Sequence, residues 1–158
     1  MTTTASGLCN CTALRQGTRH VSRLYDEALA PVGLGVNQYA ILVRLGRVGP
    51  KSIQDLAQLL VMDRSTLGRL VRPLERRRLV RLDVPSADRR ARLVVLTDEG
   101  RALVERAQPH WRRAQAIFEH RLGSEAALSL RELLMRVTSI DFQQKPADPA
   151  GGGGEETT

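Results

Sequence analysis

Apolar side chains recur along this chain with the spacing of helical faces. In the clearest case, four apolar residues after Asp63 occupy positions i, i+3, i+4 and i+7 of one segment, namely Leu67, Leu70, Val71 and Leu74. Comparable spacing predicts helices at residues 11–30, 36–45, 53–60, 64–78, 98–122 and 125–137. Because these segments make up most of the chain, the pattern predicts a mainly α fold.

Two short runs between the fourth and fifth predicted helices are typical of strands. Residues 79–82 and 92–96 are rich in Leu and Val, and a polar turn at residues 85–90 lies between them. The order of elements is therefore helix, helix, helix-turn-helix, β-hairpin, long helix, helix. This order predicts a mainly α fold with a small β-wing, a winged helix-turn-helix combined with a helical layer.

Side chains that accept backbone hydrogen bonds mark where three of these helices begin. Ser52 and Asp63 precede the third and fourth helices, where a Ser or Asp side chain accepts an otherwise free backbone N–H. Asp55 follows Ser52 by three residues, as in a capping box. Ser124, which follows a glycine break, is predicted to cap the last helix.

The long helix and the last helix carry more apolar surface than a small winged domain can cover. The residues that provide it are Trp111, Ile117, Phe118, Leu130, Leu133 and Leu134. We expect residues 11–31 and 98–142 to form a dimerisation layer, because helix-turn-helix proteins normally read DNA as two-fold dimers. The predicted partner is therefore a second copy of this chain.

These elements define the expected domain organisation. One domain is predicted to span residues 10–142, with the winged helix-turn-helix at residues 52–97. Residues 1–9 and 145–158 are expected to be flexible tails, since the second is rich in Pro and Gly and has no apolar periodicity.

The excess positive charge is concentrated in one segment. Residues 63–92 hold ten of the 24 basic residues, all arginine, against four acids, which gives +6 of the total of +7. An arginine run is often only a solvated helix face, but this run coincides with a helix-turn-helix and a hairpin. Because clustered Lys and Arg neutralise phosphates, the segment predicts binding to double-stranded DNA at a pseudo-palindromic operator. The alternative from another class is a basic RNA-binding protein.

Residues on the exposed side of the fourth helix are the candidate DNA contacts. Those expected to reach base edges are Ser65, Thr66, Arg69 and Arg72, since Arg bonds guanine in a bidentate way and Ser and Thr reach bases or phosphates. Arg64 lies on the same exposed side. Arg76 and Arg77 are expected to contact phosphates, as is typical of clustered cations near a duplex.

The polar turn of the hairpin supplies a second group of candidate DNA contacts. Arg89 and Arg90 stand at its tip, and Arg90 is expected to enter the minor groove, where narrow A·T-rich stretches have the most negative potential. Asp88 repels phosphate, so its expected role is to pair with an arginine and support the wing.

Composition argues against several other classes of protein. No segment approaches the roughly 20 apolar residues that cross a bilayer, and the N-terminus lacks the pattern of a signal peptide, so a cytoplasmic protein without membrane contact is expected. Cys9 and Cys11 are too few for a zinc site, and no metal or cofactor is expected. The three histidines have no acidic partner at a diagnostic spacing, so an enzyme is not expected, although a thiol enzyme using Cys11 stays as an alternative.

The helix-turn-helix and wing together resemble the MarR-type transcriptional regulators. The resemblance rests on the segments IQDLA at 53–57, MDRSTL at 62–67 and LVRPLE at 70–75, and on the wing segments DRRAR at 88–92 and VLTDEG at 95–100. It covers residues 10–142 and implies a dimeric DNA-binding regulator, most often a repressor that an effector releases. Many members have Gly where Arg78 stands, so this helix must end in another way.

Within that family, the start of the first helix resembles the organic-peroxide sensors of the OhrR type. Cys11 begins a Cys-x-Ala-Leu motif, Tyr25 follows at the matching spacing, and Tyr39 stands where a second pocket tyrosine would lie. Arg15 replaces a further tyrosine, although a nearby Arg itself lowers a thiol pKa. The resemblance implies release of DNA on oxidation of Cys11 by an organic hydroperoxide; otherwise Cys11 is an ordinary packing residue.

The family resemblance also implies a small-molecule effector as the other way of releasing DNA. Many MarR-type dimers bind aromatic acids or acyl thioesters between the dimer helices and the DNA-binding lobe. In this chain the candidate lining residues are Arg15, Arg19, His20 and Tyr39. The sequence names no particular ligand.

Overall fold

The computed structural model describes residue 7, residues 9–84 and residues 92–142. Helices dominate, and their bounds are α1 Asn10–Leu29, η2 Ala30–Val32 (a 3-10 turn), α2 Val36–Val48, α3 Ile53–Leu59, α4 Arg64–Arg76, α5 Asp98–Leu122 and α6 Ser124–Ser139. The strands are β1 Lys51–Ser52, β2 Val80–Asp83 and β3 Leu93–Leu96. The predicted order of helices around a hairpin, and the mainly α fold with a small β-wing, are confirmed.

The three strands form one antiparallel sheet in the order β1-β3-β2. Val80 pairs with Leu96 at the base of the wing, and Asp83 pairs with Leu93 further out. The sequence did not predict β1, in which Lys51 pairs with Val94. A strand of two residues is too short for an alternating apolar pattern, so only its pairing with β3 identifies it.

The core lies where the helix-turn-helix meets the sheet and the second helix. The largest completely buried side chains are Leu29, Ile41, Leu42, Leu45, Leu56, Leu67, Leu74, Val80 and Val94. They come from α1, α2, α3, α4, β2 and β3, so the apolar stripe that the sequence predicted on α4 faces this core. The opposite side of α4 is left exposed.

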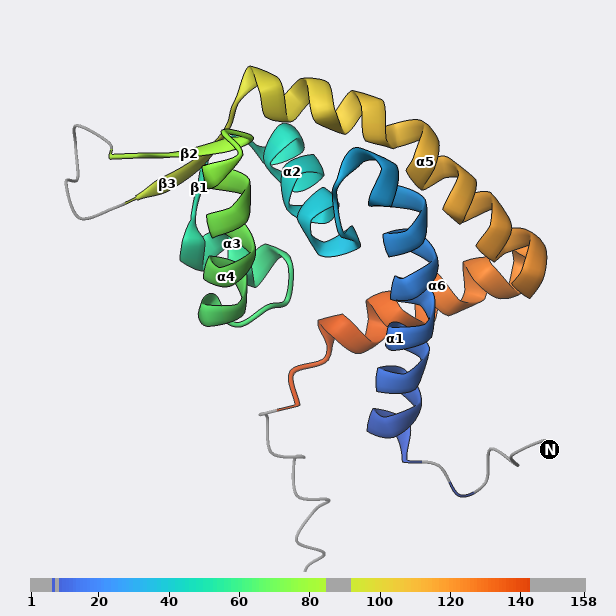
Figure 1. Ribbon diagram of the computed structural model, residues 1–158. Coiled ribbons are helices and arrows are strands. Elements are labelled where there is room, and N and C mark those ends of the chain that lie inside the picture. Colours follow the sequence, from blue (N-terminus) through green and yellow to red (C-terminus); the bar gives the residue numbers. More distant parts are fainter. Residues whose placement is uncertain (1–6, 8, 85–91, 143–158) are drawn as a thin grey trace, which may run out of the picture.

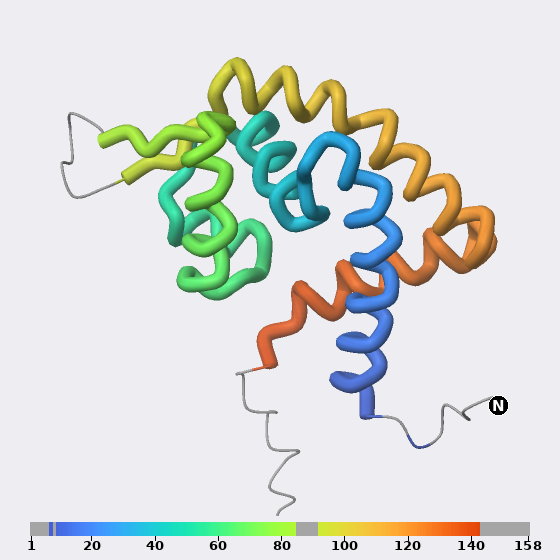
Figure 2. Tube along the Cα trace, viewed as in Figure 1, coloured from blue at the N-terminus to red at the C-terminus, as the bar shows by residue number. Residues whose placement is uncertain are grey.

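The remaining helices form a layer beside this lobe. α5 arches over α2 and α1, and α6 turns back and crosses near the lower half of α1 (Figures 1 and 2). α5 packs against α1, α2 and α6. The wing of β2 and β3 projects away on the other side of the molecule (Figure 1).

Two helices end at residues in the left-handed region that are not glycine. Arg78 has φ 58° just after α4, and Val61 has φ 52° just after α3. At Arg78 the backbone closes as a Schellman motif, with Leu79 N–H donating to Leu74 O at 2.9 Å and Arg78 N–H donating to Glu75 O at 2.8 Å. Arg78 therefore occupies the conformation that glycine adopts at lower cost, so α4 ends in the usual way although no glycine stands at this position.

The helix beginnings follow the predictions with one correction. The Ser52 hydroxyl accepts from Asp55 N–H and the Asp63 carboxylate accepts from Thr66 N–H, as expected of N-caps. Ser124 is not a cap, because α6 begins at Ser124 itself and Gly123 takes the cap position without a side-chain bond. The glycine break thus starts the helix one residue earlier than the serine suggested.

In the part of the chain that the structure describes, no single helix is long and apolar enough to cross a membrane. The pair Asn10–Val32 and Val36–Val48 meets the length and composition criteria only together, and it is bent by 73°.

Candidate nucleic-acid interface and adjoining pocket

The first turn of α4 is organised by the carboxylate of Asp63. The Ser65 hydroxyl donates to its Oδ1 at 2.6 Å, and the Thr66 hydroxyl donates to its Oδ2 at 2.6 Å. Thr66 N–H donates to Oδ1 at 2.8 Å. These donors, the Ser65 hydroxyl above all and then those of Thr66, hold the pKa of Asp63 far below its usual range.

This network determines what Ser65 and Thr66 offer to a ligand. Each hydroxyl has one hydrogen, which it gives to Asp63, so both present oxygen lone pairs outward. The Thr66 oxygen also accepts from Arg69 Nη2 at 3.2 Å, which fixes the direction of that guanidinium. The start of α4 is thus a preordered surface with Arg69 as its main donor.

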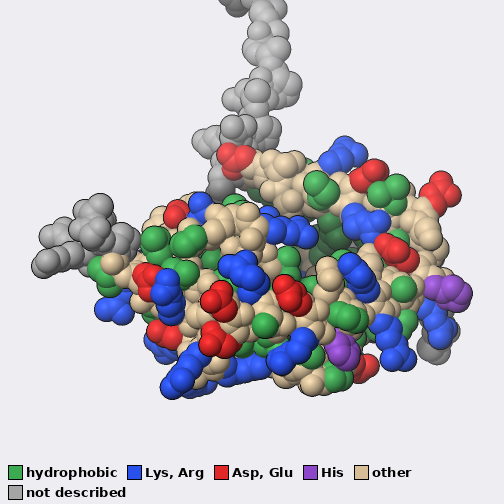
Figure 3. Space-filling model, turned by 90° about the horizontal axis from the view of Figure 1, so that it is seen from above, with side chains coloured by type: hydrophobic (Ala, Val, Ile, Leu, Met, Phe, Trp, Pro, Cys, Tyr) green, Lys and Arg blue, Asp and Glu red, His purple; other side chains and the backbone are tan. Residues whose placement is uncertain are grey.

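The predicted contact residues of α4 share one exposed face. Arg64, Arg69, Arg72 and Arg76 are all exposed, on the side opposite the buried stripe. A hollow of about 580 Å³ is lined there by Ile53, Arg64, Ser65, Gly68, Arg69 and Arg72. By contrast, acidic side chains are interspersed among basic ones on the side that α5 covers (Figure 3). The α4 face, which has only basic charged residues along this hollow, is therefore the better surface for an anionic duplex.

Arg77 differs from its neighbours on α4. Its guanidinium donates to the backbone oxygens of Gly33 at 2.5 Å and of Val32 at 3.5 Å. Its side chain is thus held at the corner between α1 and α2. Asp88, Arg89 and Arg90 lie outside the described residues.

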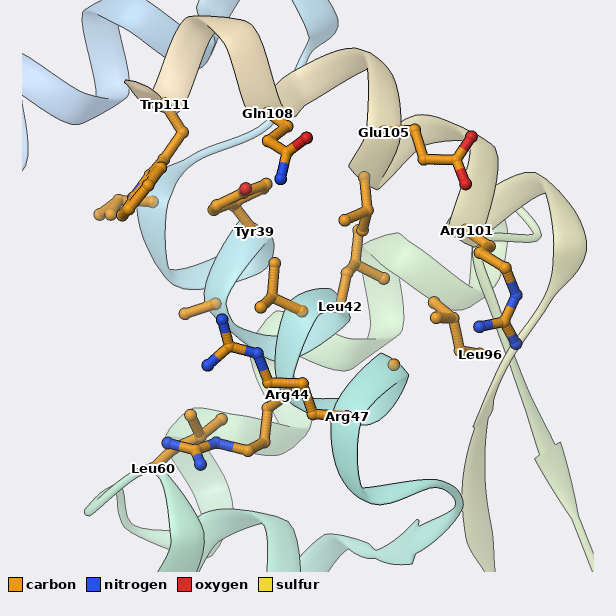
Figure 4. A pocket seen from close by; sticks show the side chains of 15 residues that line it. Tyr39, Leu42, Arg44, Arg47, Leu60, Leu96, Arg101, Glu105, Gln108 and Trp111 are labelled. Atoms are coloured by element: carbon orange, nitrogen blue, oxygen red, sulfur yellow. The ribbon is translucent and has the colours of Figure 1, made fainter. Parts of the chain in front are cut away.

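A pocket of about 600 Å³ lies between the helix-turn-helix lobe and α5. Its walls come from α2 and α5, with Leu60 and Leu96 contributing from the neighbouring elements (Figure 4). At one end the rings of Tyr39 and Trp111 are stacked, with centroids 6.3 Å apart and planes inclined by 28°. Burial raises the pKa of the Tyr39 hydroxyl, so this group stays a neutral phenol at physiological pH.

Charged side chains lie around the same pocket. Arg44 and Arg47 come from α2, while Arg101 and Glu105 come from α5 (Figure 4). Three cations and one anion beside an aromatic pair suit a ligand that joins an apolar ring to an anionic group. The arrangement supplies binding groups and no nucleophile.

Sequence reasoning found only Tyr39 among these pocket residues. Arg44 and Arg47, three residues apart on α2, were missed, and Trp111 was assigned to the dimerisation layer. In the structure Trp111 is half-buried and packs against the core, so part of its ring is already covered within one subunit. A signal was present in the spacing of the α5 lining residues, which recur with helical periodicity as Arg101, Val104, Glu105, Gln108 and Trp111.

The candidate effector residues of α1 do not line this pocket. Arg15, Arg19 and His20 are exposed on the helix surface. Tyr25 instead donates to Gln115 Oε1 on α5 at 2.6 Å. The chain of bonds continues from Gln115 to Glu119 at 2.8 Å, and Glu119 also accepts from Arg131 of α6 at 2.9 Å. Tyr25 therefore ties the three layer helices together.

The two cysteines lie exposed at the start of α1. Cys9 takes the N-cap position, and the backbone amides of Thr12 and Cys11 lower the pKa of its thiol. The helix-start argument that the sequence applied to Cys11 therefore applies to Cys9, whose sulfur is the one near the free amides.

A large apolar surface is exposed on α6 and beside it. Among its members, Leu133 is 54% exposed and Met135 71% exposed, and only Ala127 of α6 is buried. The other exposed apolar side chains of the layer are Leu14, Ile117, Leu122, Leu128, Leu130, Leu134, Val137, Ile140 and Phe142. Exposed apolar surface of this extent is typical of an interaction surface.

Comparison with known proteins adds to this geometry. A family model described as the MarR family matches residues 32–91. The HTH-type transcriptional repressor NicR of Pseudomonas putida is 28% identical over 123 residues, which are 78% of this chain and 77% of NicR. A probable transcriptional regulator from Pseudomonas aeruginosa, known as a crystal structure, is 32% identical with a TM-score of 0.72, covering 80% of this chain and 94% of that one.

A third relative has been solved in two states. The transcriptional repressor CouR bound to a 23-mer DNA duplex is 25% identical with a TM-score of 0.74, covering 82% of this chain and 92% of that one. CouR from Rhodococcus jostii RHA1 bound to p-coumaroyl-CoA has a TM-score of 0.72 at 25% identity, covering 90% of this chain and all of that one. The chain therefore belongs to the MarR family of DNA-binding transcriptional regulators, and it is a regulator and not an enzyme.

Proposed function

We propose that this protein is a homodimeric repressor that leaves its operator when a small anionic ligand enters the pocket between α2 and α5. The observation that carries the proposal is the position of that pocket. One of its walls is α2, which belongs to the helix-turn-helix lobe, and the other is α5, which belongs to the helical layer. A ligand that changes the distance between α2 and α5 also changes how the DNA-binding lobe is held. The site of action would be the cytoplasm, where operator DNA lies.

The exposed face of α4 is the proposed reading surface. Arg69 and Arg72 are the proposed guanine-reading side chains, and Arg64 and Arg76 the proposed phosphate contacts. Ser65 and Thr66 would act mainly as acceptors, for instance from the amino groups of cytosine or adenine, because their hydrogens are given to Asp63. The proposed wing contacts Arg89 and Arg90, with Asp88 as support, rest on the sequence alone.

The proposed dimer uses the exposed apolar face of α6 and the end of α5. A second copy is the occupant that suits it, since the relative CouR is a repressor bound to a duplex, and a duplex with two half-sites calls for two reading helices. Two-fold pairing of α6 would cover one helical face in both subunits at once, namely Leu130, Leu133, Leu134 and Val137.

The proposed ligand combines an aromatic or acyl group with an anion. Its ring would lie against Tyr39 and Trp111, while its carboxylate or phosphates would meet Arg44 and Arg47. That the relative CouR binds an aromatic acyl thioester is in keeping with this chemistry. The proposal applies to the class of ligand and names no metabolite.

The test measures release of DNA by candidate ligands. A duplex selected by the wild-type protein from random sequence is bound and then titrated with aromatic acids and aromatic acyl-CoA thioesters. We expect one class to release the DNA, and the Arg47→Ala variant to need more of it. Arg19→Ala is the matched control, because Arg19 is an exposed arginine of α1 outside the pocket. Equal ligand requirements for all three proteins would remove the pocket from the proposal.

A second candidate signal is thiol oxidation, favoured by the lowered pKa and the exposure of Cys9. The thiolate would attack an organic hydroperoxide, taking one oxygen to form a sulfenic acid while the alcohol leaves. A gel shift with cumene hydroperoxide on wild type, Cys9→Ser and Cys11→Ser separates the two thiols. Loss of the response in Cys9→Ser alone would assign it to Cys9, loss in Cys11→Ser alone would return it to Cys11, and no response in wild type would leave the pocket as the only proposed input.

A further inference from the structure

Arg77 makes a contact across the molecule that its neighbours on α4 do not make. It is the C-cap residue of the recognition helix, and its guanidinium donates to Gly33 O and Val32 O, more than forty residues earlier in the chain. Within the described residues, Arg64, Arg72 and Arg76 form no hydrogen bond or ion pair. The guanidinium also lies close to Gly33, where an added Cβ would meet Arg77 Nη2 at 3.5 Å.

The acceptors belong to a rigid corner of the helical layer. Gly33 has φ 68° and closes η2, with Gly33 N–H donating to Ala30 O at 2.9 Å and Leu34 N–H donating to Leu29 O at 3.4 Å. η2 itself packs against α1 and α5. The oxygens that Arg77 contacts are therefore carried by the layer that we propose to be the dimer interface, and charged donors suit such helix-end carbonyls.

The rest of α4 has little direct connection to that layer. α4 packs mainly against α2, α3 and β2, all parts of the helix-turn-helix lobe. The lobe has a second polar tie to α1, in which Asp26 Oδ1 accepts from Val36 N–H at 2.7 Å, but this tie holds the start of α2. Two polar contacts therefore join the end of the recognition helix to the layer. The Thr97 hydroxyl at the N-cap of α5 donates to Arg78 O at 2.7 Å, and the Arg77 guanidinium reaches the opposite side, at the corner between α1 and α2.

We propose that Arg77 is a positioning residue that sets the separation of the two recognition helices in the dimer, and with it the preferred spacing of the operator half-sites. The inference rests on the proposed dimeric operator binding and replaces the phosphate role that the sequence suggested. A tie at the end of α4 limits rotation of the lobe against α5, so that each helix meets its half-site at a fixed distance from the two-fold axis. Loss of the Arg77 contact leaves the exposed face of each recognition helix intact, but the distance between the two helices is no longer fixed.

Positioning and phosphate contact leave different signatures in DNA binding. A phosphate contact contributes to the release of counterions, so removing it lowers the slope of log affinity against log salt by about one. A positioning residue leaves that slope unchanged and alters the penalty for changing the half-site spacing. Arg76 is the matched comparison, because it is the adjacent arginine and is a proposed phosphate contact.

The experiment uses the full chain and a duplex that wild type selects from random sequence. The distance between half-sites is lengthened and shortened by one and two base pairs, and affinities are measured over a range of salt. We expect Arg77→Ala to reduce the preference of wild type for the original spacing by about threefold to tenfold, the range that one net hydrogen bond allows. Its salt slope should match wild type, and Arg77→Lys, which keeps a donor, should recover part of the spacing preference.

The results that overturn the inference are distinct from failure of the proposed function. If Arg77→Ala weakens all spacings equally and lowers the salt slope as Arg76→Ala does, Arg77 is a phosphate contact and the inference is wrong. If wild type enriches no duplex with two half-sites, the proposed dimeric function fails and the inference fails with it. Circular dichroism checks folding, and Arg77→Leu, which keeps the aliphatic stem but no donor, replaces the alanine variant if that one does not fold.

Discussion

Among single residues, Val61 and Arg78 carry backbone strain, Val61 in the turn between α3 and α4 and Arg78 just after the end of α4. Both lie in the left-handed region, at φ 52° and 58°. A β-branched residue such as Val61 is particularly unusual there, and its side chain is 73% exposed, so no packing explains it. The sequence showed that Arg78 stands where a glycine is common, but not that the backbone would keep the glycine conformation.

Arg78→Gly is predicted to stabilise the protein. A left-handed conformation costs a residue with a side chain roughly 1–2 kcal/mol, which glycine avoids. Part of this gain in stability is offset, because glycine makes the unfolded chain more flexible. We expect the free energy of unfolding in urea to rise by up to about 1 kcal/mol. Arg76→Gly, within α4, should lower it by about the same amount, since glycine is unfavourable in a helix. A lower stability for Arg78→Gly would show that its side chain matters more than its φ.

Asp63 makes stability depend on acid pH. The hydroxyls of Ser65 and Thr66 lower the pKa of Asp63 in the folded protein. The ionised carboxylate therefore stabilises the folded state. This contribution is complete above the pKa that Asp63 has in the unfolded chain, about 3.9, and it is lost as pH falls below that value. Asp63→Asn should therefore lose less stability than wild type between neutral pH and pH 3. Denaturant titrations at both pH values measure this, and parallel losses in the two proteins would contradict it.

At the scale of elements, the sequence predicted the type and order of the helices and of β2 and β3, because each carries an apolar stripe or run. It placed the end of α2 near Gly46, whereas the helix continues to Val48 and the positive φ of 74° falls on Gly49. Gly46 stays helical, and an added Cβ there would make an ordinary van der Waals contact with Leu96 Cδ2 at 3.5 Å. The sequence pattern does not distinguish a glycine inside a helix from one in the turn that ends it.

The close approach of α5 to the base of the wing depends on Gly100. A Cβ at this position would lie 2.1 Å from the backbone oxygen of Leu79 and 2.7 Å from Leu96 Cδ1. Gly100→Ala should therefore lower the free energy of unfolding by about 1–3 kcal/mol or more, as expected of overpacking against backbone. Gly17→Ala on α1, where an added Cβ meets nothing within 4 Å, should not be destabilising. Thermal unfolding of both variants tests this, and equal midpoints would contradict it.

The candidate site was predictable only in part. The basic face of α4 follows from arginines placed off one helical stripe, which is local information. The pocket combines Tyr39 of α2 with Trp111 of α5, and their contact depends on how α5 arches over α2. A tryptophan on a long helix suits a dimer interface and a pocket wall equally well until that packing is known.

At the scale of the whole molecule, the exposed apolar face of α6 predicts a dimer. Leu133→Lys places a charge in the centre of that face and should shift the protein to monomers at micromolar concentration, with a large loss of operator affinity. Val48→Lys, at an exposed apolar residue of α2, is the control and should keep the wild-type mass. Light scattering gives the masses; a monomeric wild type would contradict the proposed interface.

We propose that a dimer of this protein reads DNA with the exposed face of α4. The most direct measurement is the base-by-base preference obtained by selection from random duplexes with wild type, Arg69→Ala and Arg113→Ala, the last an exposed arginine of α5. We expect an inverted repeat with half-sites roughly one helical turn, about 10 bp, apart. Arg69→Ala should lose the preference at the same position of both half-sites, and Arg113→Ala should keep the wild-type profile. An unstructured wild-type profile, or one that Arg69→Ala leaves unchanged, would contradict the account.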